Sequence, residues 1–177
     1  MREAILDGFE NANKKIMSQS TGAATTLAVV ELQGHNVRPY HVGDSMILLT
    51  GQRGKRKLQS VAHSPVGYAV EAGMLDVDDA VHHEERHFVS NVVGASDMRI
   101  EIGAAVKMAR HDTLILASDG LFDNLYIDEI VDIIRSGDLM QAANELLEHA
   151  RQRMAKPETD LPCHPDDLTF ILFRRNK

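Results

Sequence analysis

The apolar residues of the chain follow two different periods, and each period predicts its own kind of element. Near the start, Ile5, Phe9, Ala12 and Ile16 recur every three or four residues, which places them on one face of a helix. Further along, runs of β-branched and apolar residues separated by short polar turns predict strands. These runs are Ala24–Gln33, Val37–Val42, Met46–Thr50, Leu58–Val61, Met98–Ile102, Thr113–Ala117 and Leu168–Phe173. Such closely spaced strands favour an antiparallel meander over alternating strand and helix units.

The remaining segments are helical or irregular. Helical periodicity returns at Ile127–Arg135 and Met140–Met154. Ser64–Arg86 mixes short helical patterns with glycines, so we expect a flap or loop insertion there. The sequence contains no internal repeat, low-complexity tract or obvious linker. We therefore expect a single α+β domain over residues 1–177, in which helices flank antiparallel strands.

Composition narrows the classes of function. The chain has 177 residues, of which 44% are hydrophobic, and its 26 acidic and 19 basic residues give a net charge of −7. Because this charge repels nucleic-acid phosphates and anionic lipid, we expect neither a nucleic-acid nor a membrane partner. The first twenty residues carry scattered charges, unlike a signal peptide. The single cysteine, Cys163, excludes an internal disulfide and favours a reducing, cytoplasmic location.

Aspartates occupy suggestive places next to the predicted strands. Asp119 follows the buried run Thr113–Ala117, Asp44 interrupts an apolar stretch between two strands, and Asp166 and Asp167 precede the last strand. Carboxylates brought together from separate strands repel one another unless a cation neutralises them, and oxygen ligands of this kind suit Mg²⁺ or Mn²⁺. Spacing alone does not show that these residues converge, because each could equally cap a helix or start a turn.

Four longer segments carry the most specific pattern in the sequence. They are GAATTLAVV (22–30), HVGDSMILL (41–49), DTLILASDGLFDNL (112–125) and HPDDLTFILF (164–173), preceded by Ala12–Asn13 in the first helix. Together and in this order they resemble the metal-dependent type 2C (PPM) protein serine/threonine phosphatases. The resemblance implies an antiparallel β-sandwich flanked by helices, in four layers α-β-β-α. It also implies that Ser60–Ser96 forms a flap beside the active site.

The same resemblance implies a metal site and a reaction. Asp119 and Asp166 would ligate the first metal ion, and Asp44 would ligate a more weakly held third ion. Asp167 stands where the family usually has asparagine. Two Mn²⁺ or Mg²⁺ ions would activate a water molecule that hydrolyses phosphoserine and phosphothreonine esters of a protein substrate, with no covalent enzyme intermediate.

One part of the family pattern is not found. The family has an upstream Asp-Gly-x-Gly-Gly turn whose aspartate bridges two metal ions, whereas the one early Asp-Gly pair here, Asp7–Gly8, falls inside the predicted first helix. We therefore expect an N-terminally incomplete phosphatase domain that is weakly active or inactive and has an open sheet edge, through which two copies could pair. Three explanations stay open: a truncated piece of a full phosphatase, a naturally short and catalytically silent relative that binds phosphoproteins or a partner, or a chain completed by a second chain.

A different enzyme class is suggested by one short motif. His83-Glu84-Glu85-Arg86-His87 fits H-E-x-x-H, the zinc metalloprotease pattern in which two histidines one helical turn apart hold Zn²⁺. The two charged residues between Glu84 and His87 speak against it, since the metalloprotease helix is usually buried. A solvated, charged flap segment is the better interpretation of this motif.

Overall fold

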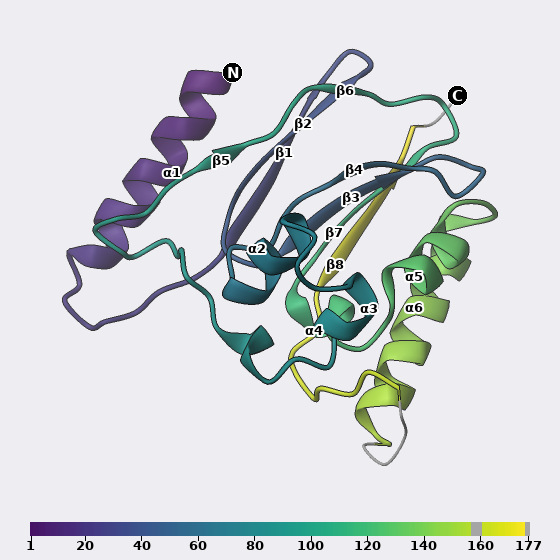
Figure 1. Cartoon of the computed structure of the whole chain (residues 1–177). Helices are drawn as coiled ribbons and strands as arrows, with labels where there is room; N and C mark the ends of the chain where they lie inside the picture. The colour runs from purple at the N-terminus through teal and green to yellow at the C-terminus, as the bar shows by residue number, and fades with distance from the viewer. Residues whose placement is uncertain (157–160, 176–177) are drawn as a thin grey trace.

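A computed structural model describes residues 1–156 and 161–175. Its helices are α1 (Arg2–Met17), α2 (Pro65–Glu71), α3 (Val77–Ala80), α4 (Asp119–Phe122), α5 (Ile127–Ile134) and α6 (Leu139–Met154), and η1 (Glu84–His87) is a 3₁₀ turn. Its strands are β1 (Leu27–Gln33), β2 (Asn36–Val42), β3 (Met46–Thr50), β4 (Arg56–Gln59), β5 (Glu101–Ile102), β6 (Val106–Lys107), β7 (Thr113–Ala117) and β8 (Phe170–Arg174). Figure 1 shows α1 on one side of the strands and α5 and α6 on the other.

The first sheet packs against α1. Strand β2 lies between β1 on one side and the short strands β5 and β6 on the other, and all of these pairs are antiparallel. Phe9 of α1 is buried in one cluster with Tyr40 and Val42 of β2, and Ile5 and Ile16 pack around it. The apolar stripe that predicts the first helix is therefore the face that covers the first sheet.

The second sheet is covered by α5 and α6. Its strands run in the order β4-β3-β7-β8, again all antiparallel. Leu48 of β3 and Ile115 of β7 are buried against Ile130 of α5 and Leu146 of α6. Burying these branched side chains stabilises this half of the domain by roughly 1.5–3 kcal/mol each.

A third cluster lies between the two sheets. Because successive side chains of a strand point to opposite faces, Ile47 and Leu49 of β3 face away from Leu48 and its helices. They pack with Val37 of β2 and Leu114 of β7, so that the two sheets share one buried interior. The expected four-layer α-β-β-α sandwich is therefore confirmed.

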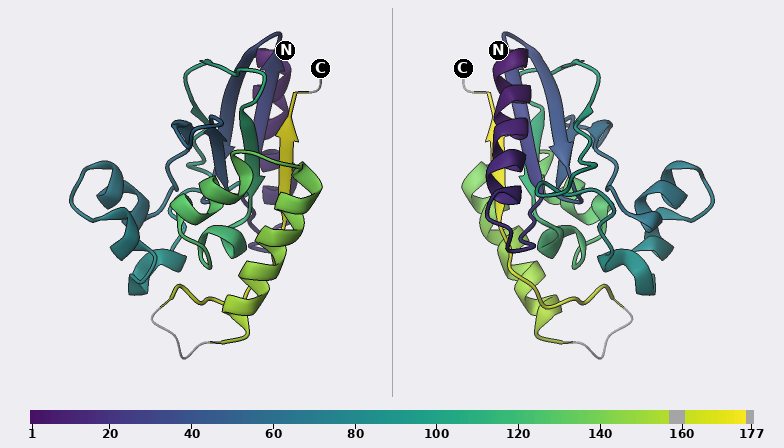
Figure 2. Two further views of the ribbon diagram at one scale, coloured as in Figure 1. Left: turned by 90° about the vertical axis from the view of Figure 1, so that its right-hand side faces the viewer. Right: turned by 90° about the vertical axis from the view of Figure 1, so that its left-hand side faces the viewer.

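Several elements are shorter or shifted relative to the sequence prediction. Strand β1 begins at Leu27 because Thr25 forms only an isolated bridge to Val93. The predicted strand at 98–102 contracts to β5, and β4 and β8 each shift by about two residues. The predicted flap contains α2, α3 and η1, and Figure 2 shows these turns projecting away from the sheet layers.

Both sheets end in a strand with one neighbour. Among the described residues, β1 pairs only with β2 along its length, and β8 pairs only with β7. Ile171 on β8 is 61% exposed, so this edge presents apolar surface. Within the same residues, no helix has the length and apolar content needed to cross a membrane.

Candidate metal centre and flap cavity

Three aspartates from distant parts of the sequence lie at one end of the second sheet. Met46 of β3 pairs with Ala117 of β7, and Ala117 pairs with Phe170 of β8. Because neighbouring strands are antiparallel, the segments just before β3, just after β7 and just before β8 leave the sheet at the same end. These segments carry Asp44, Asp119 and Asp166. Strand pairing thus shows that the three segments meet, which the spacing of the aspartates in the sequence does not show.

Asp44 lies on the short connection that passes from the first sheet to the second. Gly43 before it has φ +106°, a value that favours glycine, and an added Cβ would lie 2.4 Å from Thr26 Cγ2. The Thr26 and Ser45 hydroxyl oxygens are 2.8 Å apart, which ties the connection to the segment before β1. The backbone around Asp44 is therefore held from both sides.

Asp119 and Asp166 are positioned by the contact between the end of β7 and the loop before β8. Asp119 is the first residue of α4, and its Oδ1 accepts a hydrogen bond from the Gly120 amide at 2.9 Å. The loop is anchored by the buried Asn124, whose side chain accepts from the His164 amide at 2.7 Å and donates to the His164 carbonyl at 2.8 Å. Asp166 itself is exposed.

The three carboxylates share one electrostatic environment. Burial raises the pKa of Asp44 above its usual value, and the negative charges of Asp119 and Asp166 raise it further. Within the described residues, none of the three takes part in an ion pair. Their oxygens do not, however, form a cluster within 4.8 Å of one another. Partly desolvated oxygen ligands with unbalanced charge fit a hard divalent cation such as Mg²⁺ or Mn²⁺.

A cavity of about 280 Å³ lies between these aspartates and the flap. Asp44 and Asp119 line it on the side of the second sheet, and Asp166 lies outside its lining. Most of its remaining wall is apolar, including Val66 and Val70 of α2 and Phe122 of α4. The cavity is therefore largely apolar, but its lining also includes Arg86 and five acidic residues: Glu71, Asp78, Asp123 and the two aspartates named above.

Two polar contacts join the flap to the helices across the cavity. Arg86 of η1 forms an ion pair with Asp123, and both side chains are largely buried. His82 Nε2 lies 3.1 Å from the Tyr126 hydroxyl. Burial raises the pKa of Asp123 to about 6 despite the opposing effect of Arg86, and Asp119 adds to the rise.

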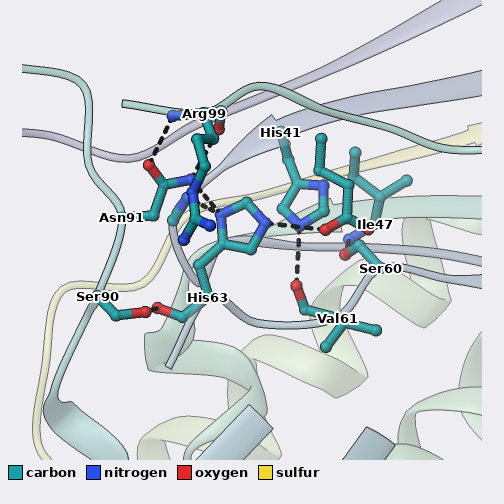
Figure 3. Close-up of polar contacts among 10 residues, drawn as sticks. His41, Ile47, Ser60, Val61, His63, Ser90, Asn91 and Arg99 are labelled. Carbon is teal, nitrogen blue, oxygen red and sulfur yellow. Dashed lines mark hydrogen bonds and ion pairs between the residues drawn. The ribbon is translucent and has the colours of Figure 1, made fainter. Parts of the chain in front are cut away.

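A pair of buried histidines lies behind Asp44, and the sequence analysis missed them. The rings of His41 and His63 stack with centroids 4.4 Å apart, and His63 Nε2 lies 3.0 Å from Glu101 Oε2. Figure 3 shows His63 between Asn91 and His41. Their only signal in the sequence is a histidine inside the apolar strand run Val37–Val42 and another directly before the glycine-bearing segment Ser64–Arg86.

The H-E-x-x-H alternative finds no support in the fold. Glu84–His87 forms a 3₁₀ turn, and His83 precedes it as its N-cap, with Nδ1 accepting from the Glu85 amide at 3.1 Å. A metalloprotease helix presents its two histidines on one face of an α-helix, which a single 3₁₀ turn does not provide. In the described part of the chain, neither His83 nor His87 belongs to a cluster of three ligand-bearing side chains.

Comparison with known proteins identifies the family. The model of the Protein phosphatase 2C family matches residues 1–160. The chain belongs to this family. Protein phosphatase PhpP of Streptococcus pneumoniae is 32% identical over 143 residues, which cover 77% of this chain and 57% of PhpP. The chain therefore spans little more than half the length of this curated relative.

Solved structures agree on the protein phosphatase 2C fold. The crystal structure of serine/threonine phosphatase Stp1 from Staphylococcus aureus has a TM-score of 0.84 at 21% identity and covers 100% of this chain and 68% of its own. The catalytic domain of serine threonine protein phosphatase PstP, solved in complex with 2 manganese ions, has a TM-score of 0.71 at 20% identity and covers 90% of this chain and 65% of its own. At these identities the likeness concerns the fold alone.

The family match reaches part of the candidate metal centre. The matched residues 1–160 of this protein phosphatase 2C member include Asp44 and Asp119, whereas Asp166 lies beyond them. Two separate observations therefore concern Asp44 and Asp119. The family match covers both residues, and strand pairing places their segments at the same end of the second sheet.

Proposed function

We propose that this chain forms the flap-bearing, metal-binding part of a metal-dependent phosphatase that hydrolyses phosphoserine and phosphothreonine esters in proteins. The observation that carries the proposal is that Asp44 and Asp119 line one cavity from separate strand ends, beneath the flap. Membership of the protein phosphatase 2C family supports it.

The proposed ligands are Asp119 and Asp166 for the first Mn²⁺ or Mg²⁺ ion and Asp44 for a more weakly held third ion. When bound, such an ion lowers the pKa of a coordinated water and neutralises phosphoryl oxygens. The carboxylates would hold the cation at the rim of the sheet, beside a cavity wall that includes Val66, Val70 and Phe122.

We further propose that the chain by itself hydrolyses phosphate esters weakly or not at all. Each of its aspartates supplies only part of a coordination sphere, and the family's Asp-Gly-x-Gly-Gly pattern is not found within residues 1–177. We also propose that the protein is cytoplasmic and that two copies pair along an open sheet edge. A silent relative that binds phosphoproteins is the alternative, and nothing in the cavity favours it over the phosphatase.

The experiment measures Mn²⁺ binding and hydrolysis separately. Isothermal titration of the chain with Mn²⁺ is expected to detect binding that Asp119→Asn removes. Asp132→Asn serves as the control, because Asp132 is 74% exposed and pairs with Arg135 at the surface. Hydrolysis of p-nitrophenyl phosphate is expected to stay low in all three proteins. Absence of Mn²⁺ binding would overturn the metal centre, whereas strong hydrolysis that Asp119→Asn abolishes would overturn the weak-activity proposal alone.

A further inference from the structure

His63 joins four separate segments of the chain. Its backbone amide donates to the Gly43 carbonyl at 3.1 Å, and its ring Nδ1 accepts from the Gly43 amide at 3.1 Å. Its own carbonyl accepts from the Ser90 amide at 2.8 Å and from the Ser90 hydroxyl at 2.9 Å. Its Nε2 lies 3.0 Å from Oε2 of Glu101 in β5. Asn91 Nδ2 lies 2.8 Å from Nδ1 (Figure 3). His63 is buried, with 3% of the residue exposed, whereas its partners Ser90 and Glu101 lie at exposed positions.

The two donors at Nδ1 determine which ring nitrogen carries the proton. Asn91 is oriented by Arg99, because its Oδ1 accepts from the Arg99 amide at 3.0 Å and its Nδ2 donates to the Arg99 carbonyl at 2.7 Å. With the amides of Gly43 and Asn91 both pointing at Nδ1, this nitrogen is an acceptor and the proton resides on Nε2. His63 then donates from Nε2 to the Glu101 carboxylate.

This proton arrangement argues against a metal ion in the histidine cluster. His41, His63 and Glu101 bring one ligand atom each to within 4.8 Å of one another. A metal on His63 Nε2 would need the proton moved to Nδ1, where it would meet two N–H groups. His41 Nε2 is likewise occupied, since it donates to the Val61 carbonyl at 2.8 Å. The cluster is a hydrogen-bonded support rather than a cation site.

The hydrogen-bonded cluster around His63 contacts the residue next to a proposed metal ligand. Gly43 directly precedes Asp44, and it exchanges two hydrogen bonds with His63. Ser90 and Asn91 follow the flap helices, whereas His63 directly precedes them, so one side chain and its backbone hold both ends of the flap. We infer that His63 is a positioning residue that sets the Asp44 connection and the flap in one fixed relation. The part of this inference that concerns metal affinity rests on the proposed function.

The test uses two substitutions that each keep one half of the imidazole. In His63→Asn the side-chain Oδ1 takes the place of Nδ1, so the acceptor for Gly43 remains and the donor to Glu101 is lost. In His63→Gln the terminal amide reaches the place of Nε2, so the donor remains and the acceptor is lost. His149→Asn, at an exposed position of α6, controls for the substitution itself. All variants are made in the 177-residue chain.

The readouts are amide hydrogen exchange and Mn²⁺ affinity. Loss of one hydrogen bond corresponds to about tenfold in an equilibrium constant, so we expect the Gly43 amide to exchange about tenfold faster in His63→Gln and within about twofold of wild type in His63→Asn. The Mn²⁺ dissociation constant is expected to rise about tenfold in His63→Gln only.

The possible outcomes separate the inference from the proposed function. Equal exchange of Gly43 in His63→Gln and wild type would overturn the inference, whether or not Mn²⁺ binds. If the two variants bind Mn²⁺ with equal affinity and lose the same amount of Tm, His63 is only a general stabilising residue and the inference is wrong. Stoichiometric Zn²⁺ binding that is lost in His41→Ala would also overturn it. If wild type binds no Mn²⁺ while Gly43 responds as expected, the support stands and only the metal centre fails.

Discussion

The carbonyl oxygen of Asp167 lies 2.3 Å from the point that a Cβ atom on Gly120 would occupy. The loop before β8 thus runs directly over the start of α4, and only the hydrogen side chain of glycine leaves room for it. The chain's own backbone therefore occupies the space beside this glycine, and the contact brings the segment of Asp166 beside Asp119.

Gly120→Ala is expected to destabilise the protein and to disturb the metal centre together. The added methyl group meets a backbone carbonyl, which cannot rotate away as a side chain can, so we expect a loss of about 2 kcal/mol or more in the free energy of unfolding. Urea denaturation measures this loss, and Mn²⁺ titration measures the effect on binding. Gly8→Ala is the matched control, because Gly8 is exposed in α1 with nothing within 4 Å of its Cβ position. That substitution is expected to stabilise the protein by about 0.5–1 kcal/mol.

Asp44→Asn is expected to weaken metal binding without weakening the metal-free fold. The carboxylate is partly buried and lies near two other negative charges, so its neutralisation relieves repulsion. Excess Mn²⁺ should raise the Tm of the wild-type chain and raise that of the variant much less, since a ligand stabilises only the state that binds it. Differential scanning fluorimetry with and without Mn²⁺ measures both effects. A loss of more than about 1 kcal/mol in the metal-free variant would contradict the prediction.

Asp123 is expected to make stability depend on pH. Its pKa in the folded protein is raised from 3.8 to about 6, so the folded state holds the proton more tightly than the unfolded state does. The stability that this group contributes is therefore present below about pH 4 and is lost as the pH rises through about 6. In Asp123→Asn this decline should be absent, as measured by urea denaturation across that range.

The control for Asp123→Asn is a carboxylate that also pairs with an arginine but lies at the surface. Asp132→Asn removes the partner of Arg135 at 2.9 Å but leaves the pH profile close to that of wild type, because exposed ion pairs contribute little. If Asp123→Asn lowers stability at pH 7 instead, the ion pair with Arg86 outweighs the cost of burial.

Asn124→Ala is expected to loosen the loop that carries Asp166. The fully buried Asn124 side chain bonds to both backbone groups of His164 and donates to the Gly120 carbonyl at 2.9 Å. Loss of these bonds leaves buried backbone groups without partners and should cost about 2–4 kcal/mol. Thermal unfolding measures the cost, and hydrogen exchange at Asp166–Thr169 should rise. The control Asn144→Ala, on the exposed face of α6, should be neutral or slightly stabilising.

Hydrophobic periodicity predicts those helices and strands whose apolar residues pack on a buried face. The stripe of Ile5, Phe9 and Ile16 gives α1, and the apolar runs give β2, β3 and β7, because each of these patterns is local and answers to one buried face. The boundaries of β4 and β8 differ because pairing with a neighbour, rather than residue type, decides where a ladder ends. Strand β6 has too few residues to show a period, and the strand predicted at 98–102 contracts to the two residues of β5.

The candidate site is less accessible from sequence because it depends on contacts between distant residues. Asp44 and Asp119 converge through the pairing of Met46 with Ala117, and no local pattern encodes that register. His63 carries no motif, and its role rests on Gly43 and Asn91, which come from two other segments. The H-E-x-x-H motif fails for the opposite reason, since a local pattern is present but the local helix is 3₁₀.

The connection that carries Asp44 has a consequence for how the protein tolerates change in its interior. This connection spans from the first sheet to the second, so its length must match the thickness of the apolar layer between them, where Ile47 and Leu49 lie. A substitution in that layer alters the distance between the sheets and hence the position of Asp44, even though the substituted side chain is remote from any ion. Substitutions that change side-chain volume between the two sheets should therefore change the affinity for the cation. In related sequences, residues of this apolar layer should covary with the residues around Asp44.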